Sequence, residues 1–333
     1  MMTAPRPDLS DRFVGCLLGC AVGDALGAPF EGYWDHQLPG RTALLRGYYE
    51  VEGYPRGQYT DDTQLTLATV ESIVRQGDLD PADVARSIVA LWKNGAVVGP
   101  GGACSRAAIN FLKNPDWTTC GAPVGQAGNG TAMRTAALGL YFLNDPERLP
   151  AAVADIARIT HQDPRSIAGG VAIAKAAELL TRDELLEPGS FCAQIARAMQ
   201  AYEPTFAALV ADLPANLLEG DETALHAIAS AGLSRPEFSR PVISPFVVPT
   251  VLACLWSLLK SPDSWANAVT RAIRLGGDVD TLGAIVGALA GARLGAAAIP
   301  AHLAAGVLDS ERIRVLASRY HAVVTARNAR PTS

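Results

Sequence analysis

The chain has 333 residues, 49% hydrophobic and 18% charged, which excludes a disordered protein and allows a sizeable core. Its formal net charge of -5 excludes a basic field for a nucleic-acid backbone, so we expect no extended nucleic-acid-binding surface. The N-terminus lacks the apolar stretch of a signal peptide, and the longest apolar run, residues 282–292, is too short to span a membrane. We therefore expect a cytoplasmic protein with no membrane partner.

Helical periodicity dominates, and no stretch repeats the alternating β pattern, so we predict an all-α fold in one domain, residues 1–333, with flexible ends at 1–10 and 328–333. In chain order, helices are expected at 13–26, after Asp61 or Asp62, from Pro81, and at 105–112, 132–143, 150–159, 166–180, 190–199, after Pro204, and at 247–259, 264–274, 281–294 and 310–327. The connectors are rich in Gly and Pro, and long connectors of this kind are often functional: 29–57, 95–102, 115–130 and 233–245.

Six cysteines occur without a CxxC pair: Cys16, Cys20, Cys104, Cys120, Cys192 and Cys254. Several lie in apolar helical runs, so we interpret them as small buried hydrophobes in a reduced protein. A disulfide framework is the weaker alternative for a chain of this size.

Glycine recurs at every fourth position in two predicted helices, at Gly15, Gly19, Gly23 and Gly27 and again at Gly283, Gly287, Gly291 and Gly295. Each glycine costs a helix roughly 0.5–1 kcal/mol relative to alanine, so a stripe of them indicates close backbone packing. Acidic residues follow the first stripe and precede the second. We therefore predict that the two helices pack antiparallel, which would bring Glu31 close to Asp278.

Two acidic clusters open predicted helices, in the sequences YTDDTQL and GGDVDT. Carboxylate and hydroxyl oxygens are the ligands that Mg²⁺, Mn²⁺ and Ca²⁺ prefer. Ordinary helix capping is the competing interpretation, and it explains one acid per helix better than two. From spacing alone, a metal site and a pair of caps are about equally favoured.

Several segments together resemble the ADP-ribosylglycohydrolase family, which includes the dinitrogenase reductase-activating glycohydrolases. They are GCLLGCAVGDALGAPFEG, YTDDTQLTLATVESI, GPGGACSRAAINFL, GNGTAMRTAALGL, ITHQDPRSIAGGVAIA and LGGDVDTLGAIVGALAGARLG. The resemblance implies a compact multi-helix domain with a binuclear metal cleft that holds two Mg²⁺ or Mn²⁺ ions. By motif match, the metal ligands are Thr60, Asp61, Asp62, Asp278, Asp280 and Thr281.

The resemblance also implies hydrolysis at the ribose C1″ of an ADP-ribosyl group. We assign Glu31 as the leading general acid/base, with metal-bound Asp61 or Asp280 as competitors. The ADP-ribose moiety would bind through Gly99, Gly101, Gly102, Ser105, Gly128, Asn129, Gly130 and His161. Without the resemblance, the first of these loops would be an ordinary loop capped by serine. The insert with Trp34, Asp35 and His36 is a place where specificity for the leaving group could reside.

Two classes of function remain in competition. The first is a metal-dependent hydrolase whose ADP-ribosylated partner is a protein, a small molecule or a nucleic-acid end, with arginine, serine or another acceptor unresolved. The second is a non-catalytic descendant that binds ADP-ribose or is structural, like the related lens crystallins. We favour the enzyme because all six expected ligand positions and Glu31 carry suitable oxygen side chains.

Overall fold

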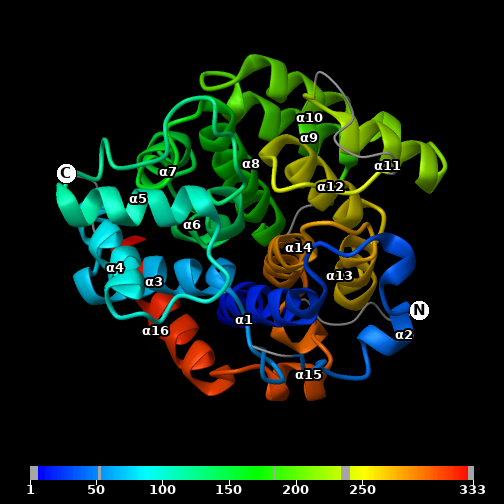
Figure 1. The fold of residues 1–333 in the computed structure, drawn as a ribbon, viewed down its shortest axis with the longest axis horizontal. Helices are drawn as coiled ribbons and strands as arrows, with labels where there is room; N and C mark the ends of the chain where they lie inside the picture. Colours follow the sequence, from blue (N-terminus) through cyan, green and yellow to red (C-terminus); the bar gives the residue numbers. More distant parts are fainter. Residues whose placement is uncertain (1–6, 52–53, 183–184, 234–240, 329–333) are drawn as a thin grey trace.

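The computed structural model describes residues 7–51, 54–182, 185–233 and 241–328, which form an all-α assembly (Figure 1). Within these ranges the β structure consists of isolated bridges. The predicted fold class is therefore confirmed. The predicted flexible ends fall largely outside the described residues, although Leu9 and Ser10 form the first turn of a helix.

The described helices mostly agree with the apolar periodicity, although it did not predict the three at Arg41–Leu44, Asp221–Ser230 and Ala301–Gly306. Those in the first half are α1 (Leu9–Gly27), α2 (Arg41–Leu44), α3 (Asp61–Gln76), α4 (Pro81–Lys93), α5 (Gly102–Lys113), α6 (Ala136–Tyr141), α7 (Leu149–Arg158) and α8 (Pro164–Thr181). Those in the second half are α9 (Pro188–Met199), α10 (Pro204–Asn216), α11 (Asp221–Ser230), α12 (Val247–Leu259), α13 (Trp265–Ile273), α14 (Val279–Leu294), α15 (Ala301–Gly306) and α16 (Ser310–Asn328). Short 3₁₀ turns occupy Ala28–Phe30, Asp35–Gln37, Ala132–Arg134 and Ala296–Ala298.

Three expectations about helix boundaries were wrong. The helix expected at 132–143 is a 3₁₀ turn followed by the short helix α6. Helix α5 begins at Gly102, three residues before Ser105, because Gly101 supplies the extended residue that precedes the helix. Thr60, rather than either aspartate, is the N-cap of α3, which leaves both carboxylates free to point elsewhere.

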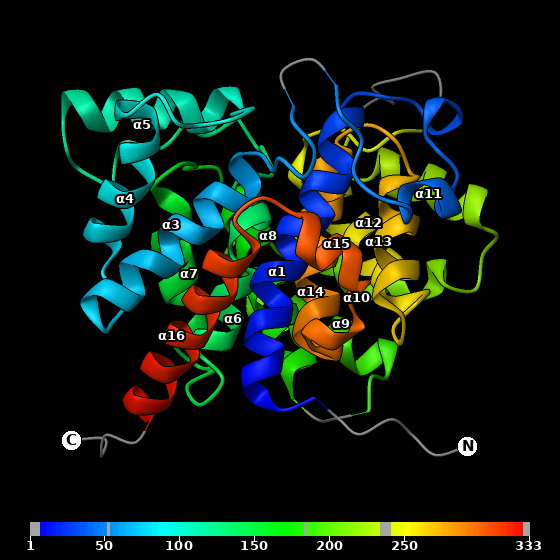
Figure 2. The same cartoon turned by 90° about the horizontal axis from the view of Figure 1, so that it is seen from below.

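Helices α1 and α14 lie side by side through the middle of the molecule, with α3 and α16 on one side and α12 and α13 on the other (Figure 2). Their glycines meet in pairs: a Cβ added to Gly15, Gly19 or Gly23 would lie 2.0–2.3 Å from a carbonyl oxygen of Gly291, Gly287 or Gly283. The order of the pairs confirms the predicted antiparallel packing. The backbones touch, so no side chain could fit between them.

Helix α1 is the one described helix that is long and apolar enough to cross a membrane by length and composition. However, 89% of its apolar window is buried inside the protein, mainly against α14. A helix that is apolar on all faces and surrounded by other helices is typical of a protein core. The six cysteines are likewise all buried and free of disulfides.

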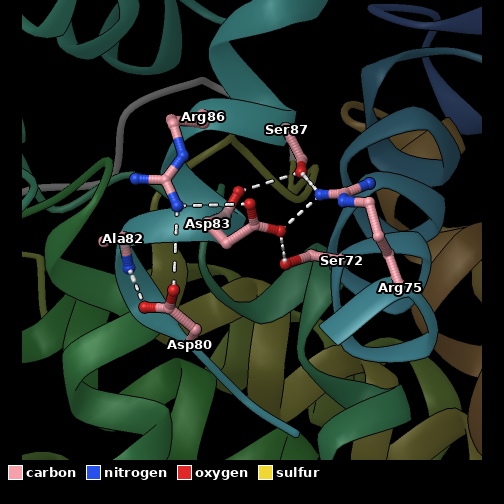
Figure 3. A network of polar contacts seen from close by, with 7 residues as sticks. All are labelled: Ser72, Arg75, Asp80, Ala82, Asp83, Arg86 and Ser87. Atoms are coloured by element: carbon pink, nitrogen blue, oxygen red, sulfur yellow. Dashed lines mark hydrogen bonds and ion pairs between the residues drawn. The ribbon is translucent and has the colours of Figure 1, made fainter. Parts of the chain in front are cut away.

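A polar network joins α3 to α4 at the edge of the molecule (Figure 3). The Asp83 carboxylate accepts hydrogen bonds from Ser72 at 2.7 Å and from Arg86 at 3.2 Å, and it also pairs with Arg75. Asp80 caps α4 by accepting from the Ala82 amide at 2.9 Å, with Pro81 in the first turn as the sequence predicts. The network fixes the C-terminal end of α3, and the N-terminal end of the same helix carries Asp61 and Asp62.

Candidate active site

Most of the predicted site residues line one cleft of about 200 Å³, where the N-terminal ends of α3, α5 and α14 meet the segment after α1. The predicted residues on its wall are Glu31, Asp61, Asp62, Gly99, Gly101, Gly102, Gly128, Asn129, Gly130, His161, Asp278, Asp280 and Thr281. Sequence reasoning did not select four further wall residues, Ala103, Cys104, Met133 and Pro245. Segments far apart in the chain therefore converge as expected.

The antiparallel packing of α1 and α14 brings the carboxylates at their ends together. Oxygen atoms of Glu31, Asp278 and Asp280 all lie within 4.8 Å of one another, an arrangement that could hold a metal ion. The Gly32 amide donates to the Gly277 carbonyl at 2.8 Å, which fastens the Glu31 turn to the start of α14. Gly277 has a φ of +87°, a conformation that residues with a side chain rarely adopt.

Asp24 supports the site from behind, and sequence reasoning did not select it as a site residue. It is fully buried near the end of α1, and its carboxylate accepts hydrogen bonds from the backbone amide and the hydroxyl of both Thr60 and Thr63. These bonds hold the first turn of α3, which carries Asp61 and Asp62. The available signal was an acid inside an otherwise apolar helix, because a buried charge requires partners.

Burial dominates the electrostatics of the carboxylates. It raises the pKa of Asp61, Asp62 and Asp280 well above the ordinary value, and repulsion from neighbouring carboxylates raises it further. Burial and then the charge of Asp278 also raise the pKa of Glu31. The oxygens Asp62 Oδ1 and Asp280 Oδ1 are buried without a hydrogen-bond partner. A group of acids arranged in this way is more stable with a cation among them.

The Gly128-Asn129-Gly130 turn is attached firmly to the rest of the cleft. The Asn129 amide donates to the Pro245 carbonyl at 3.0 Å, and its side-chain nitrogen donates to Asp278 and to Thr250. Beneath the turn, the buried guanidinium of Arg134 donates to the Gly130 carbonyl. The turn is therefore held rigidly beside the acidic cluster.

His161 is buried against the same turn and remains neutral at pH 7. Burial, followed by the charge of Arg134, lowers the pKa of His161 to about 3. Its Nδ1 lies 2.9 Å from the Thr160 hydroxyl. A Cβ added to Gly130 would lie 2.8 Å from the His161 ring, so only glycine allows this close approach.

Two predicted residues do not line the cleft. Thr60 is fully buried behind it, and its hydroxyl donates to Asp24 at 3.1 Å and contacts Asp62 at 3.3 Å. Ser105 lies in the second turn of α5, where its hydroxyl accepts from the Trp92 indole at 3.3 Å. The early start of α5 is the physical reason for the position of Ser105.

Comparisons with known proteins agree on one family. A sequence profile described as ADP-ribosylglycohydrolase matches residues 5–330. The chain is 30% identical over 299 residues to the ADP-ribosyl-[dinitrogen reductase] glycohydrolase of Rhodospirillum rubrum, covering 88% of this chain and 89% of that protein. It is 27% identical to the ADP-ribosylhydrolase ARH3 of Gallus gallus, with 87% of each chain covered.

Two further matches extend this result. The ADP-ribosylarginine hydrolase Tri1 of Serratia proteamaculans (strain 568) is 26% identical, and the match covers 95% of this chain and 80% of that protein. A solved structure described as an ADP-ribosylglycohydrolase-related protein complex superposes with a TM-score of 0.69 at 28% identity. The match covers 95% of this chain and 98% of the chain in the solved structure. The similarity therefore includes the whole arrangement of helices and not just the cleft.

Proposed function

Because the chain belongs to the ADP-ribosylglycohydrolase family and is therefore a glycohydrolase acting on ADP-ribosyl groups, we propose that it is an Mg²⁺- or Mn²⁺-dependent hydrolase. In this proposal it cleaves the bond at the ribose C1″ of an ADP-ribosylated protein, small molecule or nucleic-acid end, and it releases ADP-ribose. The buried, disulfide-free cysteines support a cytoplasmic location.

One observation carries the proposal: acids from α3 and α14 converge with Glu31 on one cleft. The donor set fits hard divalent cations, because it consists of carboxylate and hydroxyl oxygens, and two of its buried oxygens, Asp62 Oδ1 and Asp280 Oδ1, have no protein partner. By the motif match, the residues that would hold two ions are Thr60, Asp61, Asp62, Asp278, Asp280 and Thr281; all but Thr60, which lies behind the wall, line the cleft. When bound, such ions supply positive charge that orients the ribose hydroxyls and makes a nearby water more acidic.

Glu31 has the properties of a general acid/base. It is exposed, its carboxylate oxygen lies within 4.8 Å of those of Asp278 and Asp280, and its pKa is raised, which suits a group that must both accept and donate a proton. In the balanced reaction, the bond between C1″ and the acceptor breaks and a water oxygen bonds to C1″. One proton of that water passes through Glu31 to the departing acceptor, and the other stays on the new hydroxyl. Asp61 and Asp280 are the competing candidates for this role.

Two loops would bind the rest of ADP-ribose. The amide of Gly102 lies at the N-terminus of the 12-residue helix α5, where backbone N–H groups and the helix dipole favour a diphosphate, while the Gly101 amide donates to the Asp61 carboxylate. This arrangement needs no basic patch, in agreement with the acidic net charge of the chain. His161, as a neutral ring beside Gly128 and Gly130, would hydrogen-bond to the ligand without adding charge. A non-catalytic descendant is not favoured, because its cleft would have no reason to keep these acids.

The test measures ADP-ribose release from substrates linked through arginine, serine or a nucleic-acid end, with Mg²⁺, with Mn²⁺ and with a chelator. We expect release only with a metal. Asp278→Asn should lower both metal affinity and turnover, because it removes a ligand. Glu31→Gln should keep the metal affinity and slow turnover by about 100-fold or more, in the range of lost general acid–base catalysis.

The matched control is Glu219→Gln, which removes an exposed carboxylate before α11 and should change neither quantity. Release that continues at full rate in the chelator would remove metal dependence from the proposal. Normal turnover in Glu31→Gln would remove that residue from the mechanism.

A further inference from the structure

Arg134 is a buried arginine without an acidic hydrogen-bond partner in the described part of the chain. The residue is 1% exposed and ends the 3₁₀ turn Ala132–Arg134, beneath the Gly128-Asn129-Gly130 turn. Its guanidinium donates to two backbone carbonyls, that of Gly130 and, at 3.0 Å, that of Ile156, while its Nε atom has no partner. Removing a full charge from water is expensive, so a buried cation is ordinarily paired with an acid. The charge of Arg134 is instead left to act on its surroundings.

The surroundings of Arg134 are the two loops that would bind ADP-ribose. A Cβ added to Gly130 would lie 2.8 Å from both Cys104 Sγ and a carbon of the His161 ring, and Cys104 belongs to the first turn of α5. After burial, the charge of Arg134 is the next cause of the lowered pKa of His161. It also opposes the rise that burial and then the charge of Asp61 produce in the pKa of Cys104. The positive charge therefore acts at the helix start where the diphosphate would bind.

The wall of the cleft supplies acids but, among the residues that the structure describes, no lysine or arginine. Its charged side chains are Glu31, Asp61, Asp62, Asp278 and Asp280. Metal ions would neutralise part of this charge, but an anionic diphosphate would still approach a mainly acidic surface. A cation inside the protein acts through a low dielectric and is screened little by salt, so one buried arginine can influence this end of the cleft.

We propose that Arg134 is the counter-charge of the diphosphate, a positioning residue that holds a fixed positive potential at the start of α5 from beneath the Gly128-Asn129-Gly130 turn. The inference rests on the proposed hydrolase function, whose product would be ADP-ribose. An arginine suits this position because its guanidinium stays protonated when buried and its planar donors hold two backbone carbonyls at once. The same charge disfavours cations at the nearby acids, so its removal should have opposite effects on the two kinds of ligand.

The experiment measures two affinities of Arg134→Met by calorimetry: that for ADP-ribose with the metal-loaded protein, and that for Mn²⁺ with the metal-free protein. We expect ADP-ribose to bind about 10- to 50-fold more weakly, because the diphosphate loses its counter-charge. We expect Mn²⁺ to bind about 2- to 10-fold more tightly, because Asp61 loses a competing cation. A purely structural role predicts a different result, since a displaced turn would lose the hydrogen bond from Asn129 to Asp278 and weaken the binding of both ligands.

Arg319→Met is the matched control, because it makes the same change of net charge at an exposed position of α16 and should alter neither affinity by more than about twofold. Arg134→Lys keeps the positive charge and loses part of the hydrogen bonding, so its affinity for ADP-ribose should stay within about 5-fold of the parent value. Weaker binding of both ligands to Arg134→Met, or a larger loss in Arg134→Lys, would overturn the inference. If Arg134→Met does not fold, the lysine variant decides the question by the same limit.

The two proposals fail separately, because neither affinity depends on turnover. If no linked substrate releases ADP-ribose, the hydrolase proposal is refuted, whereas opposite shifts of the two affinities in Arg134→Met still support the counter-charge. A parent protein that does not bind ADP-ribose would overturn the inference about Arg134.

Discussion

The contact between α1 and α14 predicts that Gly19→Ala destabilises the protein, although alanine is the better helix former. The added Cβ would lie 2.2 Å from the Gly287 carbonyl oxygen, whereas ordinary contacts begin at 3.4 Å, so the two helices would have to separate by the 1.2 Å difference. The obstructing atom belongs to the backbone and cannot rotate away. The same carbonyl accepts a hydrogen bond from the Trp265 indole at 3.0 Å, which the separation would weaken.

The expected net loss in free energy of unfolding is about 2 kcal/mol. Overpacking costs roughly 1–3 kcal/mol and the weakened hydrogen bond about 1 kcal/mol, while the gain in helix propensity is at most about 1 kcal/mol. Urea unfolding followed by circular dichroism would measure the loss. Gly102→Ala is the control, because a Cβ at this helical position meets nothing within 4 Å and should be neutral or stabilising. A Gly19→Ala protein as stable as the parent would refute the view that the glycine stripes exist to let the backbones meet.

Two further predictions concern buried carboxylates. Asp24→Asn should weaken Mn²⁺ binding, measured by calorimetry, by about 10- to 100-fold. The reason is that the asparagine amide group cannot accept all the hydrogen bonds that Thr60 and Thr63 donate to the carboxylate. Unchanged affinity would show that Asp24 does not position α3. For Asp83, burial opposes ionisation, but hydrogen bonds from Ser72, Arg75 and Arg86 outweigh it and lower the pKa to about 2. Since the folded-state pKa lies below the unfolded value of 3.8, the stabilisation is full above about pH 4 and is lost as pH falls toward 2. Asp83→Asn should therefore lower the free energy of unfolding by about 1–2 kcal/mol at pH 7, a value reduced for solvent screening because Arg75 and Arg86 are half exposed. Urea titrations at pH 3 should show a smaller loss. A loss that does not vary with pH would contradict this account.

The all-α fold and the meeting of the acids were predictable from the sequence, because both depend on local periodicity. Apolar positions at helical spacing predicted α12 to the residue, as Val247–Leu259. The two glycine stripes predicted close packing of the helices, and the acids at their ends predicted the antiparallel direction, which places Glu31 beside Asp278. A regular spacing within a helix defines a face, and a face without side chains lets another backbone approach closely.

The tertiary structure alone decided which side chains line the site and which support it from behind. Asp24 and Arg134 stand in apolar contexts that do not identify their distant partners, since Thr60 lies 36 residues from Asp24 and Ile156 lies 22 residues from Arg134. Ser105 does not line the cleft because α5 begins at Gly102, with Gly101 as its N-cap. Residue spacing in the sequence does not show whether Gly101 or Ser105 caps this helix. The segments around Tyr33, Ile243 and Gly277 meet through backbone hydrogen bonds, and such contacts between loops depend on the packing of the helices that carry them.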